Sequence, residues 1–360
     1  MKISIAMPGY TNVPVGGYNV HYTYANILAG KGHDVTILFP RYLGFDRTWK
    51  TPLSAYLWAR RTRAENKPLV ASVKLDARIK TLLVPDLHDQ ALPQADALIA
   101  TGWQTAEALD HAPSNRGKKF YIVYDYEHWM TASPDIRKRI ESTFSDRFDI
   151  IATSSIVQEM IEKCGGHAKR VIYCGLELEN FTMEVAPQAR KAMTVGFPAR
   201  HESFKGFDDA VRTASLLRDR YGEQITVTTF GSRKPAMPDW IHWLQYPSQQ
   251  ALRDFYNEQA VFMLPSHFEG WGLTGVEAMS CGAALVVTDN GGSKDYAIDE
   301  QTALVVPPKQ PQRLADAIIR LLEDEDLRIR LALAGQEKVQ QYTWANAGDA
   351  LDEFLTGAVA

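Results

Sequence analysis

Two glutamates in the second half of the sequence stand where an open α/β sheet binds its ligands. Glu269 and Glu277, eight residues apart, belong to the segment PSHFEGWGLTGVEAMSCG. A strand is predicted over 261–264 and a helix from about Leu273, so Glu269 lies in the loop between them and Glu277 inside the helix. The apolar neighbours of Glu277 indicate that its carboxylate faces a cleft, where it needs hydroxyl or cationic partners. A carboxylate that accepts two hydrogen bonds suits a vicinal diol such as a ribose.

Groups suited to binding a phosphate stand in the same kind of predicted turn from a strand into a helix. The predicted helix start at Gly272, Leu273 and Thr274 offers backbone N–H groups to a phosphate. Arg200 and Lys205, in the segment GFPARHESFKG, flank another predicted turn from a strand into a helix. Cations beside a helix N-terminus oppose its dipole, so an anion held there, such as a diphosphate, would explain them. The alternative, two solvated side chains, remains open.

A glycine pair marks a third turn of this kind, near the start of the chain. Gly16 and Gly17 end the segment GYTNVPVGG, between a predicted strand and a predicted helix. Glycines at a helix N-terminus let the backbone approach a phosphate. The segment is not G-x-G-x-x-G, and a simple turn is an equal alternative.

Short apolar runs that alternate with helical stretches must position these turns. The runs are near-continuously apolar, as strands buried on both faces of a parallel sheet are. The pattern runs once through the first half and restarts after a polar stretch near 184–190, which predicts two doubly wound, Rossmann-like α/β domains in series. Strands are predicted over 3–7, 35–39, 97–100, 120–124, 150–153 and 171–173, then over 193–197, 225–230, 261–264, 284–288 and 303–306.

The predicted domain boundary lies near residue 186. Residues 1–185 form the first predicted domain and residues 186–344 the second. A final helix, expected over about 345–356, either covers the second domain or crosses back onto the first, so that 345–360 would join the first domain.

Composition excludes several classes of protein. The 360 residues are 45% hydrophobic and 23% charged, with a net charge of −4, which argues against a disordered chain and against recruitment of nucleic acid by a basic field. No apolar run is long enough to span a bilayer, and the first residues are too short a stretch for a signal peptide. Three cysteines without C-x-x-C spacing suit a reducing cytosol, so a cytoplasmic location is expected.

The glutamate segment resembles the donor-binding signature of GT-B retaining glycosyltransferases of family 4. Its pattern here is P-S-x-x-E-G-x-G-L-x-x-x-E-A-M-x-C-G, and the earlier G-x-x-x-R-x-x-x-x-K-G looks like that family's diphosphate clamp. Gly16 and Gly17 occupy the place of the family's amino-terminal glycine loop, and the 171–181 segment resembles its interdomain strand, with Cys174 in place of the usual Asn. The resemblance covers nearly the whole chain and is strongest from 191 to 308.

The resemblance implies a role for each of these residues. Arg200 and Lys205 would bind the diphosphate of a nucleotide-sugar donor and stabilise the leaving phosphate, and Glu277 would hold the ribose hydroxyls. Glu269 would contact hydroxyls of the transferred sugar, with the amides from Gly270 to Leu273 around sugar and phosphate. Catalysis would need no protein nucleophile, no metal and no cofactor, because the departing phosphate takes the acceptor proton.

The sequence departs from the family at one position. Where the family often has a histidine that reaches the donor sugar, Tyr124 stands here, followed by Asp125, Glu127 and His128. Any of these three could supply the sugar contact or be structural, and the sugar itself could differ, for example a deoxysugar.

The acceptor is expected to be a glycan, a lipid-linked molecule or a small molecule, in the synthesis of cell-surface polysaccharide or glycoconjugate. Residues 41–67 carry seven basic and two acidic residues among interleaved aromatics, a local charge of +5. Such a segment can lie on an anionic membrane surface, although a solvated helix is an equal alternative. Asp324-Glu325-Asp326 matches a metal-binding D-x-D pattern but falls in a predicted helix, where a solvated face is expected.

Two rival functions share the predicted architecture. One is another enzyme of this fold, a nucleotide-sugar epimerase, or a phosphorylase that would need pyridoxal phosphate on a lysine. The other is a non-catalytic scaffold that binds a nucleotide sugar. The intact set of Arg200, Lys205, Glu269 and Glu277 argues against the scaffold.

Overall fold

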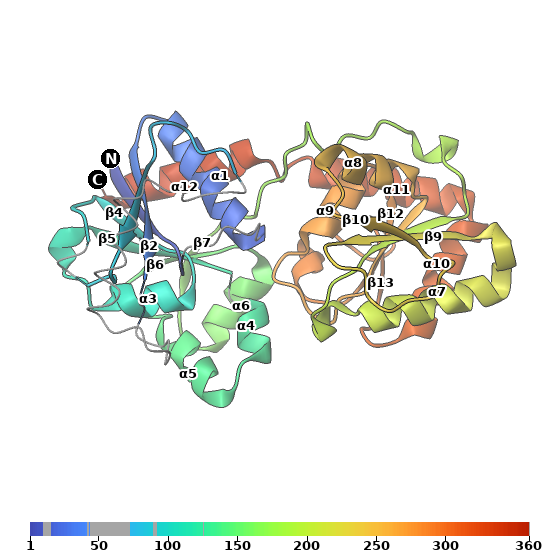
Figure 1. The fold of residues 1–360 in the computed structure, drawn as a ribbon, viewed down its shortest axis with the longest axis horizontal. Helices are drawn as coiled ribbons and strands as arrows, with labels where there is room; N and C mark the ends of the chain where they lie inside the picture. The colour runs from blue at the N-terminus through green and yellow to red at the C-terminus, as the bar shows by residue number, and fades with distance from the viewer. Residues whose placement is uncertain (10–15, 42, 44–72, 89–91, 125, 360) are drawn as a thin grey trace. The chain divides into compact units, whose positions relative to one another are not determined.

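A computed structural model describes the chain except for residues 10–15, 42, 44–72, 89–91, 125 and 360. It divides into two compact units (Figure 1). The first unit comprises Met1–Cys174 together with Trp344–Ala360, and the second comprises Gly175–Thr343. The boundary expected near 186 falls inside the second unit, and the final helix belongs to the first.

The first unit is built on a parallel sheet of seven strands within the described residues, in the order β3-β2-β1-β4-β5-β6-β7. β1 lies inside the sheet, between β2 and β4, and its residues after Lys2 are buried, as in any parallel sheet covered by helices. The strands are β1 (Lys2–Ala6), β2 (Asp34–Pro40), β3 (Lys80–Val84), β4 (Ala97–Ala100), β5 (Lys118–Val123), β6 (Asp149–Ala152) and β7 (Ala168–Val171).

The helices of the first unit include one from the far end of the sequence. They are α1 (Gly16–Gly30), α3 (Trp103–Asp110), α4 (Tyr126–Thr131), α5 (Pro134–Ser142), α6 (Ser155–Lys163) and α12 (Trp344–Val359). α12 packs against α1, and the two lie side by side in Figure 1. The contact is close, because a Cβ added at Gly348 would stand 2.4 Å from Cγ2 of Ile27. Lys31 of α1 pairs with Asp349 of α12 at 2.6 Å.

The second unit repeats the design with six parallel strands in the order β10-β9-β8-β11-β12-β13. These are β8 (Thr194–Pro198), β9 (Thr226–Gly231), β10 (His242–Gln245), β11 (Val261–Leu264), β12 (Ala284–Thr288) and β13 (Leu304–Val306). Between them run α7 (Phe207–Tyr221), α8 (Gln249–Glu258), α9 (Leu273–Ser280), α10 (Pro311–Glu323) and α11 (Glu325–Val339). Figure 1 shows α7 and α10 on one face of the sheet and α8, α9 and α11 on the other.

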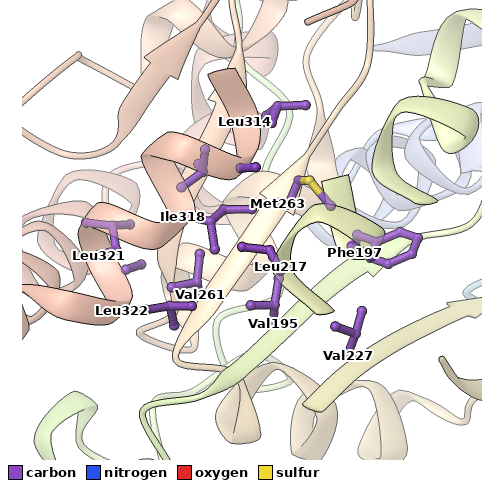
Figure 2. Packing of buried hydrophobic residues seen from close by; sticks show 14 of the residues in the cluster. Val195, Phe197, Leu217, Val227, Val261, Met263, Leu314, Ile318, Leu321 and Leu322 are labelled. Atoms are coloured by element: carbon purple, nitrogen blue, oxygen red, sulfur yellow. The ribbon is translucent and has the colours of Figure 1, made fainter. Parts of the chain in front are cut away.

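Apolar side chains make up most of the core between this sheet and α7 and α10. Leu217 of α7 and Ile318 of α10 lie over Val195, Val261 and Met263 of the central strands (Figure 2). All five side chains are fully buried. The apolar face of α10 that covers the sheet is therefore formed by Leu314, Ile318, Leu321 and Leu322.

The sequence analysis predicted the central strands but missed strands at the edges. β3 and β10, each the outermost strand of its sheet, were not predicted, and β7, another edge strand, lies over 168–171 instead of 171–173. An edge strand is partly exposed, so it lacks the continuous apolar run that identifies a buried strand. β10, for example, reads HWLQ and has no fully buried side chain.

Candidate active site

Lys205 and Glu269 form an ion pair at the carboxyl ends of the central strands in the second unit. Lys205 ends a short 3₁₀ turn, 203–205, after β8, and Glu269 lies in the loop between β11 and α9. Lys205 Nζ donates to Glu269 Oε2 at 2.8 Å, and Ser266 Oγ donates to Glu269 Oε1 at 2.7 Å. Both carboxylate oxygens therefore have a partner, as a buried carboxylate requires.

The two loops that carry this ion pair are joined at several further points. The backbone N–H of His267 donates to the carbonyl oxygen of Phe204 at 2.7 Å, and the rings of Phe204 and Phe268 stack with centroids 4.7 Å apart. His267 Nε2 lies 2.8 Å from Oδ2 of Asp209 in the first turn of α7. These contacts tie the two loops together, so the ammonium of Lys205 and the carboxylate of Glu269 are held as one unit.

Glycines allow the close backbone approaches in this region. Gly206 adopts a left-handed φ of 70°, and a Cβ there would stand 2.1 Å from the carbonyl oxygen of Pro265. A Cβ at Gly292 would stand 2.6 Å from the carbonyl oxygen of Glu269. Only glycine fits at positions 206 and 292 without moving the loops, because any other residue would place a Cβ against a backbone oxygen.

Glu277 lies on α9, eight residues after Glu269, but its environment differs from that of the ion pair. Its Oε2 accepts a hydrogen bond of 2.8 Å from the hydroxyl of Tyr256 on α8. Burial raises the pKa of Glu277 to about 7, and the Tyr256 hydrogen bond and the nearby positive charge of Arg200 oppose that rise. A carboxylate with such a pKa is poised to change its charge near neutral pH.

Of the four charged residues singled out from the sequence, two are in direct contact. Lys205 contacts Glu269, whereas Arg200 is exposed in the turn after β8 and acts on Glu277 electrostatically. The assignment of these four residues to a diphosphate, a ribose and a sugar stays a prediction.

The start of α9 lies next to Glu269, as expected. Gly272 is the N-cap of α9 with a left-handed φ of 84°, and its carbonyl oxygen accepts a hydrogen bond of 2.8 Å from the Tyr296 hydroxyl. Leu273 and Thr274 occupy the first turn, where backbone N–H groups have no partner within the helix. Gly270 is buried in the loop before them.

The site residues predicted in the first half of the sequence lie in the first unit. Gly16 and Gly17 are the first two residues of α1, and a Cβ at Gly17 would meet open space. Tyr124 directly follows β5, and its hydroxyl accepts a long 3.6 Å hydrogen bond from Cys174 Sγ. Glu127 and His128 belong to α4, and His128 is exposed. Asp125 and almost all of the basic segment 41–67 lie outside the described residues.

Three polar residues of the second unit were not predicted as site residues. Ser266 binds Glu269 and stands three residues before it, within the motif, so its hydroxyl could have been found by local spacing. Tyr256 binds Glu277 from 21 residues away on another helix, and nothing in the local sequence indicates that contact. Asn290 is buried, and its carbonyl oxygen accepts the backbone N–H of Glu269 at 2.9 Å.

Outside the undescribed gaps, no group of three or more His, Cys, Asp or Glu side chains is arranged to hold a metal ion. Among the helices of the described chain, none is both long and apolar enough to cross a membrane. Asp324 of the D-x-D match caps α11, accepting the backbone N–H of Leu327 at 2.9 Å, and all three residues of that run are exposed.

The family model for glycosyl transferases group 1 matches residues 182–338, the part of the chain that carries all four charged site residues. Among curated proteins, a D-inositol 3-phosphate glycosyltransferase from Corynebacterium urealyticum is 26% identical over 252 residues, covering 61% of this chain and 59% of that protein. A capsular polysaccharide biosynthesis glycosyltransferase, CapM, from Staphylococcus aureus is 22% identical over 259 residues, 67% of each chain. The chain spans about three fifths of the length of the inositol-phosphate relatives that it matches.

Solved structures show the same fold over the whole chain. A sucrose-phosphate synthase from Thermosynechococcus elongatus has a TM-score of 0.76 at 17% identity and covers 99% of this chain and 98% of its own. The Anabaena protein HepE, solved with UDP and glucose, has a TM-score of 0.74 at 16% identity and covers 99% of this chain and all of its own. The predicted architecture, GT-B with two Rossmann-like domains, is confirmed.

Proposed function

We propose that the protein transfers a sugar from a nucleotide diphosphate-sugar to a hydroxyl group of an acceptor, because residues 182–338 match the family model for glycosyl transferases group 1. The observation that carries the proposal is the Lys205–Glu269 ion pair at the carboxyl ends of β8 and β11, with Arg200 near enough to Glu277 to oppose the rise of its pKa. Two cations and two carboxylates at one sheet edge match a ligand that has both phosphates and hydroxyls. The structure of HepE with UDP-glucose supports this class of donor.

Each group then has a part in donor binding. The ammonium of Lys205 and the guanidinium of Arg200 neutralise the diphosphate, and the N–H groups at the start of α9 donate to it. Glu277 accepts hydrogen bonds from the ribose diol. Glu269, held by Ser266 on one oxygen, accepts from hydroxyls of the transferred sugar.

The Lys205–Glu269 ion pair has a consequence for this binding. Before the donor arrives, the negative charge of Glu269 holds the Lys205 ammonium in place. A diphosphate that binds then competes with Glu269 for this ammonium. Such preorganisation lowers the cost of ordering a flexible lysine side chain during the reaction.

We propose that the reaction retains configuration at the anomeric carbon. The acceptor oxygen attacks that carbon on the face from which the diphosphate departs, the bond from the carbon to the phosphate oxygen breaks, and a phosphate oxygen takes the acceptor proton. No covalent enzyme intermediate and no metal ion enter this scheme. The rate then depends on positioning and on stabilisation of the charge that develops on the diphosphate, which is the task of Lys205 and Arg200.

The acceptor is proposed to be a glycan, a lipid-linked molecule or a small molecule, in line with the capsular polysaccharide relative from Staphylococcus aureus. Tyr124, Asp125, Glu127 and His128 remain candidates for sugar or acceptor contacts from the first unit. Gly16 and Gly17 remain candidates for donor contacts.

A thermal-shift panel tests the donor site. UDP, GDP, ADP and dTDP, each alone and as a hexose conjugate, are added to the wild type, to Glu277→Ala and to Glu223→Ala. Glu223 is a matched control because its side chain is 95% exposed at the far end of α7. A ligand at 100 times its Kd adds about 2.7 kcal/mol, which raises the Tm by several degrees.

We expect one nucleotide to stabilise the wild type and Glu223→Ala but not Glu277→Ala. Stabilisation of none of the three by any ligand would contradict the donor site. Once the nucleotide is known, product analysis separates the rival functions, because an epimerase releases a changed sugar without an acceptor, whereas a transferase needs one.

A further inference from the structure

We propose that Tyr256 is a positioning residue that orients the Glu277 carboxylate for recognition of a ribose diol, and so sets the preference of this site for ribonucleotides over 2′-deoxyribonucleotides. The inference rests on the proposed function, which assigns the ribose to Glu277. The sequence motif around Glu277 does not include Tyr256, because Tyr256 belongs to α8 and Glu277 to α9.

The Tyr256 side chain is fixed by its surroundings. It is fully buried, and its ring packs edge-on against those of Phe181 and Phe262, with centroids 6.0 and 5.3 Å away. Its carbonyl oxygen accepts a hydrogen bond of 3.2 Å from the guanidinium of Arg190. With ring and backbone both held, the hydroxyl stays at one point, 2.8 Å from Glu277 Oε2.

A hydroxyl in this place orients the carboxylate without saturating it. A tyrosine hydroxyl donates a single hydrogen, whereas a carboxylate has about four acceptor sites. One site of Oε2 is occupied by Tyr256, which fixes the plane of the carboxylate and leaves Oε1 for a ligand. A vicinal diol needs two acceptor sites in a defined plane, while a 2′-deoxyribose needs only one.

The same hydrogen bond affects the charge of Glu277. The groups that face this carboxylate are Tyr256 from α8, Arg200 from the turn after β8, and Cys281 at the end of α9. Burial raises the pKa of the Cys281 thiol to about 12, so it stays neutral, and Arg190 lies near that thiol. Tyr256 and Arg200 therefore oppose the effect of burial on Glu277. Loss of the Tyr256 hydroxyl raises the Glu277 pKa further above about 7.

The test compares ribose with deoxyribose. For the base selected by the thermal-shift panel, calorimetry gives the Kd of the nucleoside diphosphate and of its 2′-deoxy form (UDP with dUDP, GDP with dGDP or ADP with dADP) from pH 5.5 to 8.5. The ratio of the two Kd values cancels the titration of the terminal phosphate, which both ligands share. In the wild type we expect a ratio of about tenfold or more at high pH, since a hydrogen bond to a charged group is lost.

Tyr256→Phe removes only the hydroxyl. We expect the ratio at pH 7 to fall at least threefold and its midpoint to move to higher pH. At pH 8.5 the ratio should recover only in part, because Glu277 is then charged but no longer oriented. Tyr221→Phe is the matched control, because Tyr221 also donates to a glutamate, Oε1 of Glu323, at 2.9 Å, but at the exposed far end of α7. The ratio and its midpoint should match the wild type in that variant. Glu277→Gln should abolish the pH dependence, and adding Tyr256→Phe to it should change nothing more.

An unchanged ratio and midpoint in Tyr256→Phe would overturn the proposal. Equal weakening of both ligands with an unchanged midpoint would overturn it as well, because it indicates a merely structural role. If no nucleotide binds the wild type, the proposed function fails instead. The coupling of Tyr256 to Glu277 is then measured without ligand, as a loss of thermal stability between pH 6 and 8 that Tyr256→Phe deepens and Glu277→Gln removes.

Discussion

The two units carry the same kind of sheet, but the side chains at their carboxyl edges differ in charge. In the first unit, Tyr124 lies against the ring of His21, with centroids 5.1 Å apart, and against the thiol of Cys174. Burial lowers the pKa of His21 to about 3 and raises that of Cys174 to about 12, so both groups are neutral at physiological pH. In the second unit, the edge holds the charged Lys205–Glu269 pair and a carboxylate that titrates near neutrality.

The difference supports our proposal that the second unit binds the anionic donor. A neutral buried cluster contributes packing and hydrogen bonds but gives no attraction to phosphate, whereas the ammonium of Lys205 and the guanidinium of Arg200 do. The shared fold accounts for neither edge, since the residues that differ lie in the loops and helices that follow the strands.

The largest effect is expected when a cation is removed from the charged edge of the second unit. Lys205→Ala should lower kcat by about 100- to 1000-fold, because a preorganised donor to the leaving group is lost. Lys191→Ala, which removes an exposed lysine of the same unit, should leave kcat unchanged. Turnover is measured with the donor identified by thermal shift, and near-wild-type kcat in Lys205→Ala would show that this edge does not stabilise the leaving diphosphate.

A second prediction concerns the backbone that supports the charged edge. Gly206→Ala should lower the free energy of unfolding by about 2–5 kcal/mol, because a left-handed residue gains a Cβ and that Cβ meets a backbone oxygen. Gly165, just after α6, is the control, since it has a φ of 83° but open space around a Cβ. Gly165→Ala should cost only about 1–2 kcal/mol. Urea unfolding of the two variants measures the difference, and equal losses would mean that the clash at Pro265 is relieved.

A third prediction uses the titration of Glu277. Its pKa in the folded protein, about 7, lies above the ordinary value of 4.5, so the folded state binds more protons between these values. The stability of the wild type is therefore expected to fall as the pH rises from about 4.5 to 7. Glu277→Gln, which stays neutral, should be more stable than the wild type by about 2–3 kcal/mol at pH 8 and no more stable at pH 4. Thermal unfolding across this range without nucleotide checks the sign, and a gain that is equal at both pH values would refute the assignment.

The smallest effect is expected at the neutral edge. Tyr124→Phe should cost about 1 kcal/mol of stability, the usual contribution of one hydrogen bond, and leave the Kd of the nucleotide within twofold of the wild type. Calorimetry with the identified nucleoside diphosphate measures the Kd. A large loss of nucleotide affinity would mean that the neutral edge also takes part in nucleotide binding.

Central strands and charged motif residues were predictable because each has a local signal. β11 and β12 were predicted over 261–264 and 284–288, where they lie, since buried parallel strands are continuous apolar runs. Glu269 and Lys205 stand in glycine-rich turns directly after such runs. Their direct contact did not follow from the sequence, because 64 residues separate them and only the β8–β11 pairing brings the two turns together.

Other features had no local signal to read. The edge strand β10 is only partly buried, and the residue that binds Glu277 lies on a different helix. Tyr256 looks in the sequence like one more apolar residue of an amphipathic helix that also buries Phe255. Only tertiary packing gives its hydroxyl a partner, so a sequence pattern cannot separate its packing role from its polar one.

The placement of α12 has a consequence for how the chain folds as it is made. The first unit is not continuous in sequence, since Trp344–Val359 is translated only after the whole of the second unit. Until then, the face of α1 that receives Gly348 and Trp344 is uncovered, whereas residues 175–343 contain a complete sheet and its helices. Domains generally fold as units during synthesis. The second unit can therefore finish folding before the first, although the first is synthesised earlier.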